Sequence, residues 1–165
     1  MKTAIIYSTH HGTTETVAKH MQDQLYPQKV ELINLATNKL PDTNNYDIVI
    51  LGSSIHAGRN QRNMQNFCKR NLPELLQKDI GLFLCCMNEG QNEQNIQNAY
   101  PEILRKHAFC VQIMGGEFKM DRMNFIEKLL TSKIVGVTMS QSKLNYPGID
   151  RFVSRIKGLK SVQQV

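Results

Sequence analysis

The sequence predicts an α/β protein in which helices cover both faces of a parallel five-stranded sheet. Short apolar runs alternate with helical patterns along the whole chain. The first, third and fourth runs are almost wholly apolar (AIIY, IVIL and LFLCC), which is typical of strands that are buried on both faces. The connections are short, and no repeat, low-complexity tract or Gly/Ser linker interrupts them. We therefore expect a single domain over residues 1–165.

Each expected element follows from its own pattern. Apolar and β-branched runs that end in polar or turn residues predict strands. These strands are expected at Thr3–Tyr7, Val30–Asn34, Ile48–Gly52, Gly81–Cys86 and Phe109–Met114. Apolar residues at helical spacing predict the helices between and after them. These helices are expected at Thr13–Gln24, Asn60–Asn71, Glu93–Lys106 and Gly148–Gly158.

Length and composition are those of a globular cytoplasmic protein. The chain has 165 residues, of which 41% are hydrophobic, so it is long enough to bury a proper core. It contains neither an apolar run near 18 residues nor a signal-peptide pattern. The four cysteines form no CxxC motif, and three of them lie in apolar helix or strand contexts. We expect reduced core thiols there, not a disulfide framework or a metal site.

A hydroxyl-rich turn joins the first strand to the first helix. Residues Ser8-Thr9-His10-His11-Gly12-Thr13-Thr14 follow the buried strand, and a helical pattern begins at once. Free N–H groups and the helix dipole would face a phosphate there. The patterns GxxxxGK[ST] and GxGxxG are absent, so the loop suits a terminal monophosphate such as that of FMN. The alternative is an ordinary turn with a threonine cap. A metal at the His-His pair is not expected, because no convergent Cys/His spacing accompanies it.

These residues resemble the phosphate loop of flavodoxins, a hydroxyl-rich run that ends in Thr-Gly-x-Thr-Glu. Gly12, Thr14 and Glu15 match the ending, while His10 and His11 stand where flavodoxins usually carry Thr or Ser. The resemblance implies a flavodoxin-like three-layer sandwich with strand order 2-1-3-4-5, and a ligand where the first and third strands end. It also implies FMN as the cofactor. The implied phosphate contacts are Ser8, Thr9, His10, His11, Gly12, Thr13 and Thr14.

The loop after the third strand is the second candidate contact with the flavin. In flavodoxins the matching loop packs one face of the ring, often with a tryptophan, but this chain has none. The residues expected to contact the ring are Ser53, Ser54, Ile55, His56, Ala57 and Gly58. His56 and Arg59 are the candidate catalytic residues, because they could tune the reduced ring. Alternatively, His56 is a polar loop residue without a ligand, and Arg59 belongs to a solvated helix start.

The loop after the fourth strand is the third candidate contact. Its expected cofactor-binding residues are Cys86, Met87, Asn88, Glu89 and Gly90, through their backbone more than through thiol chemistry. Flavodoxins commonly cover the second face of the ring with a tyrosine from this loop. Here no aromatic residue occurs before Tyr100, which falls in a helical region. We therefore expect an open ring face on which a flat substrate could stack.

Charge separates this chain from typical flavodoxins, which are acidic. The net charge is +6, yet residues 1–118 hold eleven basic and eleven acidic side chains, so all the excess lies in residues 119–165. A stripe at helical spacing runs through this part: Met120, Met123, Ile126, Leu130 and Ile134. Basic residues flank it. Such a segment could lie on an anionic membrane, cover a hydrophobic substrate, or pack as a surface helix on the core.

This basic amphipathic insertion, at about residues 116–145, carries a second resemblance. GGEFKMDRMNFIEKLL and the Ser-Ser-Ile-His-Ala-Gly-Arg loop resemble the menaquinone-dependent protoporphyrinogen dehydrogenases among flavodoxin-domain proteins. Members of that subfamily bind FMN, associate peripherally with the membrane, and oxidise protoporphyrinogen IX in haem biosynthesis. The resemblance implies the same chemistry here.

The leading hypothesis is an FMN-dependent oxidoreductase that passes electrons from an apolar substrate to a quinone. A neutral or basic surround favours this, because it relieves the electrostatic penalty on reduced anionic flavin. Contact with the inner face of the membrane is expected through residues 119–134. The alternatives are a flavodoxin that carries single electrons between protein partners, and a flavin-free interaction module. Nucleic acid is not an expected partner, since no recognition motif accompanies the charge.

Overall fold

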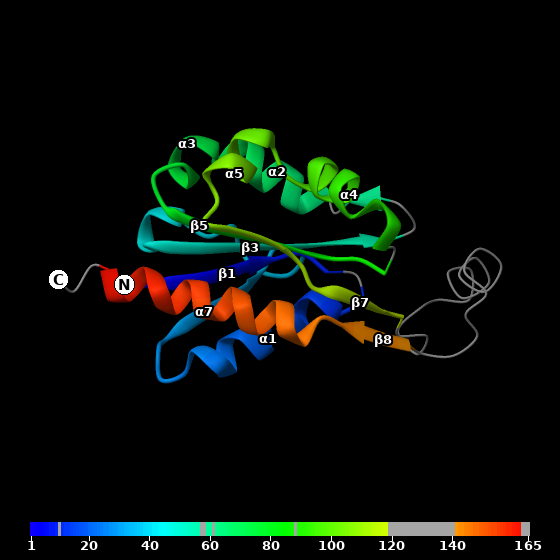
Figure 1. The fold of residues 1–165 in the computed structure, drawn as a ribbon. Helices are drawn as coiled ribbons and strands as arrows, with labels where there is room; N and C mark the ends of the chain where they lie inside the picture. Colours follow the sequence, from blue (N-terminus) through cyan, green and yellow to red (C-terminus); the bar gives the residue numbers. More distant parts are fainter. Residues whose placement is uncertain (10, 57–58, 61, 88, 119–140, 163–165) are drawn as a thin grey trace.

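The computed structural model describes residues 1–9, 11–56, 59–60, 62–87, 89–118 and 141–162. Five parallel strands form its central sheet in the order β2-β1-β3-β5-β6 (Figure 1). They are β1 (Thr3–Tyr7), β2 (Val30–Asn34), β3 (Ile48–His56), β5 (Asp79–Cys85) and β6 (Cys110–Ile113). Counted along the chain, this is the order 2-1-3-4-5, so the predicted flavodoxin-like sheet is confirmed.

Three further strands lie at the carboxyl end of the sheet. Strand β4 (Arg59–Asn60) turns back on the end of β3 as an antiparallel pair. Strands β7 (Gly115–Phe118) and β8 (Gln141–Leu144) form a separate antiparallel hairpin. The hairpin projects beyond the ends of β3 and β5 (Figure 1). Phe118 stands opposite Gln141, so the segment between them leaves and returns at adjacent positions.

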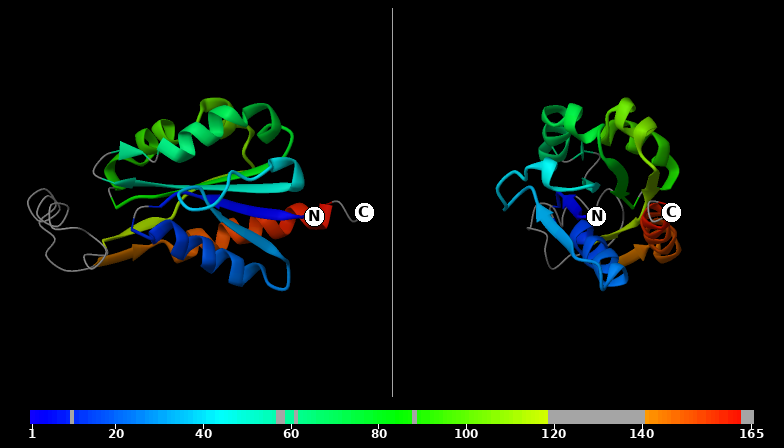
Figure 2. Two further views of the ribbon diagram at one scale, coloured as in Figure 1. Left: turned by 180° about the vertical axis from the view of Figure 1, so that it is seen from behind. Right: turned by 90° about the vertical axis from the view of Figure 1, so that its left-hand side faces the viewer.

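Helices form one layer on each face of the sheet, which completes the three-layer sandwich (Figures 1 and 2). On one face lie α1 (Thr13–Leu25) and α7 (Tyr146–Val162). The other face carries α2 (Arg62–Arg70), α3 (Leu72–Leu75), α4 (Asn92–Ala99) and α5 (Glu102–His107). Two short 3₁₀ turns, η1 (Thr43–Asn45) and η2 (Glu89–Gln91), lie in connections. Within the described ranges, no helix is long and apolar enough to cross a membrane.

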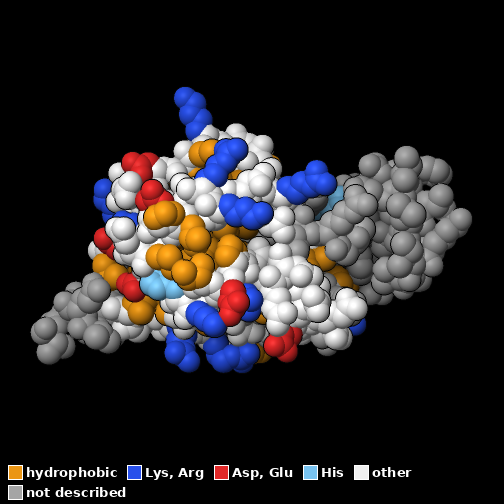
Figure 3. All heavy atoms as spheres, turned by 90° about the horizontal axis from the view of Figure 1, so that it is seen from above, with side chains coloured by type: hydrophobic (Ala, Val, Ile, Leu, Met, Phe, Trp, Pro, Cys, Tyr) orange, Lys and Arg blue, Asp and Glu red, His pale blue; other side chains and the backbone are white. Residues whose placement is uncertain are grey.

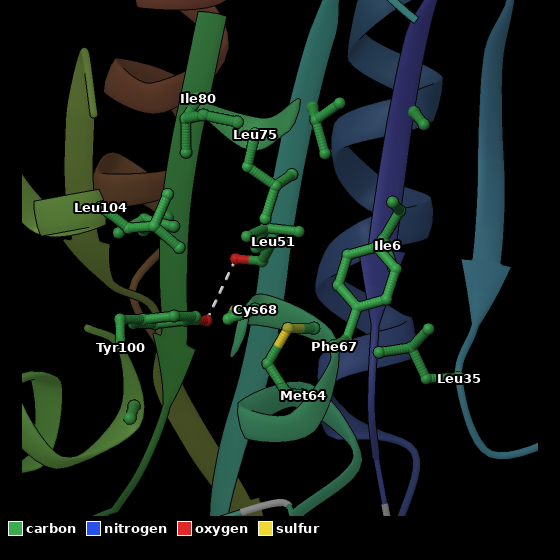
Figure 4. Close-up of a cluster of buried hydrophobic side chains, with 14 of the residues drawn as sticks. Ile6, Leu35, Leu51, Met64, Phe67, Cys68, Leu75, Ile80, Tyr100 and Leu104 are labelled. Atoms are coloured by element: carbon green, nitrogen blue, oxygen red, sulfur yellow. Dashed lines mark hydrogen bonds between the residues drawn. The ribbon is translucent and has the colours of Figure 1, made fainter. Parts of the chain in front are cut away.

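Alternation along the buried strands creates two separate cores. In β1, Ile5 and Tyr7 face α1 and α7, whereas Ala4 and Ile6 face the opposite helical layer. The first core is completed from the helices by Val17, Ala18, Met21, Leu25, Ile149, Phe152, Val153 and Ile156. The second is completed by Met64, Phe67, Cys68, Leu75, Ala99, Tyr100 and Leu104 (Figure 4). Because both faces are covered, the central strands β1, β3 and β5 are mostly apolar, as the sequence indicated.

Tyr100 connects the second core to the sheet through its hydroxyl group. Its hydroxyl lies 2.6 Å from the carbonyl oxygen of Phe83 and 3.1 Å from that of Leu51, which belong to neighbouring strands. Figure 4 shows the phenol reaching from the helical layer to β3. Burial raises the pKa of Tyr100 well above its usual value. The phenol therefore has a structural role and lies inside the protein, away from the surface where a ligand would stack.

The outer surface of the α2–α5 layer is mixed in character. Figure 3 shows a few hydrophobic side chains gathered near its centre, with Lys and Arg side chains around them. Ile103 of α5 contributes the most exposed large apolar side chain of this layer among the described residues, at 50%. Such a distribution is ordinary for a solvent-facing helical layer.

Several element boundaries differ from the expected ones. Strand β3 continues four residues past Gly52, because Ser53 and Ser54 still pair with β5. The helix expected at Glu93–Lys106 is broken at Tyr100-Pro101, since proline has no N–H to donate and holds the preceding residue in extended geometry. Helix α7 begins two residues early, where the Asn145 side chain accepts a hydrogen bond from the Gly148 N–H.

Gly115 allows the sharp change of direction from β6 into the hairpin. Its φ is 72°, and an added Cβ would overlap the carbonyl oxygen of Lys143. Gly115→Ala should therefore lower the free energy of unfolding by at least about 2 kcal/mol. Gly158→Ala is the matched control, because nothing lies near a Cβ at this position in α7. It should raise stability by about 0.5–1 kcal/mol. Urea unfolding measures the stability of both variants. Equal stability of Gly115→Ala and the wild type would contradict the left-handed backbone and close contact assigned to Gly115.

Candidate functional site

The carboxyl ends of β1 and β3 are tied together at the sequence-predicted phosphate loop. Ser8 is buried, and its N–H donates to the Gly52 carbonyl oxygen at 3.0 Å. The chain then turns through Gly12, whose φ of 86° is left-handed and favours glycine. The Gly12 N–H donates to Thr9 Oγ1 at 2.9 Å, and the Gly12 carbonyl accepts from the Thr16 N–H and hydroxyl. The turn is thus fixed by its own hydroxyl groups.

The first turn of α1 carries hydrogen-bond donors that have no acceptor among the described residues. The N–H groups of Thr13, Thr14 and Glu15 have no acceptor within the helix, as at any helix start. The Thr14 side chain is fully buried, and its hydroxyl has no hydrogen-bond partner of normal geometry among the described residues. Together with the helix dipole, these donors fit an anion of the size of a phosphate.

Cys85 borders this turn from β5. Burial raises the pKa of its thiol to about 12, while the neighbouring Thr14 hydroxyl acts in the opposite direction. A thiol is a weak hydrogen-bond acceptor, so it does not replace a strong partner for Thr14. Cys85 therefore lines the site as an unreactive thiol.

The second predicted contact region is a β-hairpin, not an irregular loop. Ser53 is buried, and Ser54 and Ile55 are partly buried along the extension of β3. His56 then stands directly opposite Arg59 across the antiparallel pair. The structure thus brings the backbones of the two candidate catalytic residues together. Their side chains lie outside the described part of the structure, so their catalytic roles remain predictions.

The third predicted region begins with a residue whose backbone N–H is already hydrogen-bonded within the protein. The Cys86 N–H donates to the Gly115 carbonyl oxygen at 2.8 Å, so β7 continues the sheet edge here. The buried Cys86 Sγ lies 3.8 Å from Asn92 Oδ1 and 3.9 Å from Asn95 Nδ2. Backbone N–H contacts to a ligand in this region would then come from the residues after Cys86. Met87 is partly buried, and the 3₁₀ turn that follows contains Glu89 and Gly90.

Part of the predicted site lies outside the described residues. This part comprises His10, Ala57, Gly58, Asn88 and the amphipathic stripe between residues 119 and 134. Within the described ranges, no group of three or more His, Cys, Asp or Glu side chains could hold a metal ion. None of the four cysteines, all of which are described, forms a disulfide, and three of them are buried.

The sequence did not identify Glu117 as a site residue. Its backbone carbonyl lies 3.5 Å from the Thr13 hydroxyl, which brings β7 against the first turn of α1. Glu117 is partly buried, and its Oε2 atom is shielded from solvent. A pair of glycines before it, Gly115 and Gly116, was the available signal for a close approach of the backbone.

Comparisons with known proteins agree with this geometry. A family model described as "Flavodoxin domain" matches residues 4–145. Protoporphyrinogen IX dehydrogenase [quinone] of Escherichia coli strain K12 is 32% identical over 72 residues, which are 42% of this chain and 40% of that protein. The match therefore spans less than half of that relative.

Two solved structures share the fold. The flavodoxin of Streptococcus pneumoniae TIGR4 superimposes with a TM-score of 0.57 at 13% identity, over 96% of this chain and 99% of that one. Oxidised Flavodoxin 2 of Bacillus cereus superimposes with a TM-score of 0.51 at 21% identity, over 70% of this chain and 82% of that one. At such identities the two structures are evidence for the fold alone.

A pair of threonine variants tests whether the first turn of α1 is built for a ligand. Thr14→Val removes a buried hydroxyl without a good partner, so stability without ligand should stay within about 0.5 kcal/mol of wild type or rise. Thr3→Val is the matched control, because the buried Thr3 hydroxyl accepts a 2.7 Å hydrogen bond from Gln28. It should cost about 1 kcal/mol in chemical denaturation. A larger loss for Thr14→Val than for Thr3→Val would show that the Thr14 hydroxyl stabilises the fold.

Proposed function

Because the chain belongs to the flavodoxin domain family, we propose that it is an FMN-dependent oxidoreductase that passes electrons from an apolar substrate to a quinone. The family binds FMN and carries electrons between redox partners. The finer proposal takes the reaction of protoporphyrinogen IX dehydrogenase [quinone] as its guide, because that enzyme is the curated relative with 32% identity.

The observation that carries the proposal is the set of donors at the first turn of α1 that have no acceptor among the described residues. FMN ends in a monophosphate, which the N–H groups of Thr13, Thr14 and Glu15 and the Thr14 hydroxyl would hold. No lysine is needed for this, in contrast to nucleotide loops that grip a triphosphate. When bound, FMN supplies the exchange of two electrons with a substrate and their onward transfer.

The ring would lie between the β3–β4 hairpin and the turn after β5, where ligands of open α/β sheets bind. His56 and Arg59, which stand opposite each other across the β3–β4 pair, would orient the ring and offset negative charge on its reduced form. Tyr100 is engaged with the sheet inside the second core, so it does not cover the ring. An uncovered face of the flavin ring would allow a flat, apolar substrate such as a tetrapyrrole to stack on it.

The distribution of charge supports a partner at the membrane. Residues 1–118 are electrically neutral, whereas residues 119–165 carry the whole excess of six positive charges. We propose that the protein is cytoplasmic and that the basic segment at residues 119–134 meets the inner face of the membrane, which is anionic and holds the quinone. The alternative function is a one-electron carrier between protein partners, for which the same charge would attract an acidic protein.

Anaerobic titration of the FMN-reconstituted protein distinguishes these two functions. An oxidoreductase linked to quinone should bleach in one two-electron step, and should then oxidise protoporphyrinogen when a menaquinone analogue is supplied. A carrier should accumulate a one-electron-reduced form with its own visible spectrum. The second spectrum, without turnover of protoporphyrinogen, would exclude the proposed enzyme.

A loop-exchange variant tests the role of the basic segment. Because Phe118 and Gln141 are directly opposed, residues 119–140 can be replaced by Asn-Gly, which closes a two-residue hairpin. The variant should bind FMN within about threefold of wild type but should lose quinone reduction. Full quinone turnover by the variant would contradict the role given to this segment.

Thr14→Val also tests the proposed phosphate contact directly. Loss of a hydrogen bond to a charged phosphate should weaken FMN binding by about tenfold or more. Binding of riboflavin, which has no phosphate, should be unchanged. Quenching of flavin fluorescence measures both affinities, and an equal loss for the two flavins would place the phosphate elsewhere.

A further inference from the structure

Strand β7 bridges two sides of the proposed FMN site. On one side the Cys86 N–H donates to the Gly115 carbonyl oxygen at 2.8 Å. Gly116 packs so closely there that an added Cβ would lie 2.8 Å from Met87 Cγ. On the other side the Glu117 carbonyl oxygen faces the Thr13 hydroxyl at 3.5 Å. The strand that leads into the basic segment is thus docked on the first turn of α1.

This docking brings a carboxylate close to the place where the phosphate would bind. Glu117 is partly buried, and its Oε2 atom is shielded from solvent. Burial is the main cause of the raised pKa of the Cys85 thiol, and the charge of Glu117 adds to it in the same direction. The same thiol interacts with the hydroxyl of Thr14. Glu117 and Thr14 therefore share a neighbour, and one of them is a proposed phosphate contact.

We propose that Glu117 competes with the FMN phosphate for the positive end of α1, and so sets the affinity for the cofactor. This inference rests on the proposed function. A helix N-terminus attracts either anion, but two anions at one turn repel each other through a medium that screens less well than water. The turn also contains an acidic residue of its own, Glu15, which forms an ion pair with Lys19 at 2.6 Å.

Linkage makes the competition reciprocal. If docked Glu117 weakens phosphate binding, bound phosphate must weaken the docking of Glu117 by the same factor. Binding of FMN would then loosen β7, and with it the base of the basic segment. Riboflavin carries the same ring without the phosphate, so it should not have this effect.

Flavin affinities of Glu117→Gln test the proposal. Fluorescence titration should show FMN bound about tenfold more tightly than by wild type, and riboflavin bound equally. Glu102→Gln is the matched control for loss of one negative charge, because Glu102 is exposed in α5 on the opposite face of the sheet. It should leave both affinities unchanged. An FMN affinity that is unchanged or weaker in Glu117→Gln would overturn the proposal.

Hydrogen exchange on the wild-type protein provides a second test that needs no variant. At saturation, the amides of residues 115–118 should exchange faster with FMN than with riboflavin. Slower exchange with FMN, or equal rates, would overturn the competition even if Glu117→Gln failed to fold. If the wild type bound neither flavin, the proposed function and this inference would both be wrong. If it bound FMN but failed either of these tests, only this inference would be.

Discussion

The first turn of α1 offers more hydrogen-bond donors than the described residues satisfy, and the rest of the proposed site depends on these donors. Three N–H groups lie at the helix start, beside a fully buried Thr14 hydroxyl that has no good partner in the described structure. Buried donors that stay unpaired cost free energy, so a fold that retains them is prepared for an external acceptor. The order of the strands would place this acceptor at the carboxyl ends of β1 and β3, from which the chain continues to helices on opposite faces of the sheet.

The hairpin β7–β8 connects this site to the part of the chain that is unlike a carrier flavodoxin. It begins at Gly115, whose left-handed backbone favours glycine, and it reaches the phosphate loop at Glu117. The basic segment leaves from its outer end. The proposed cofactor site and the basic segment are therefore joined by one short strand.

Much of this architecture could be predicted from the sequence, because it depends on local patterns. Apolar runs in the sequence predict the buried strands, and the hydroxyl-rich turn before Thr14 predicts the start of a helix. The extension of β3 could not be predicted, since Ser53 and Ser54 become strand only by pairing with β5. Glu117 was missed for a similar reason. Its place beside α1 comes from a contact across 104 residues of sequence, to which no local pattern points.

The central claim is that an anion bound at the first turn of α1 is the phosphate of FMN. Amide ¹H–¹⁵N spectra of the protein, recorded during titration with FMN and separately with riboflavin, test it most directly. The amides of residues 12–15 should move strongly with FMN and little with riboflavin, because only FMN brings a charge to these N–H groups. Equal shifts with both flavins, or shifts confined to other parts of the chain, would contradict the claim.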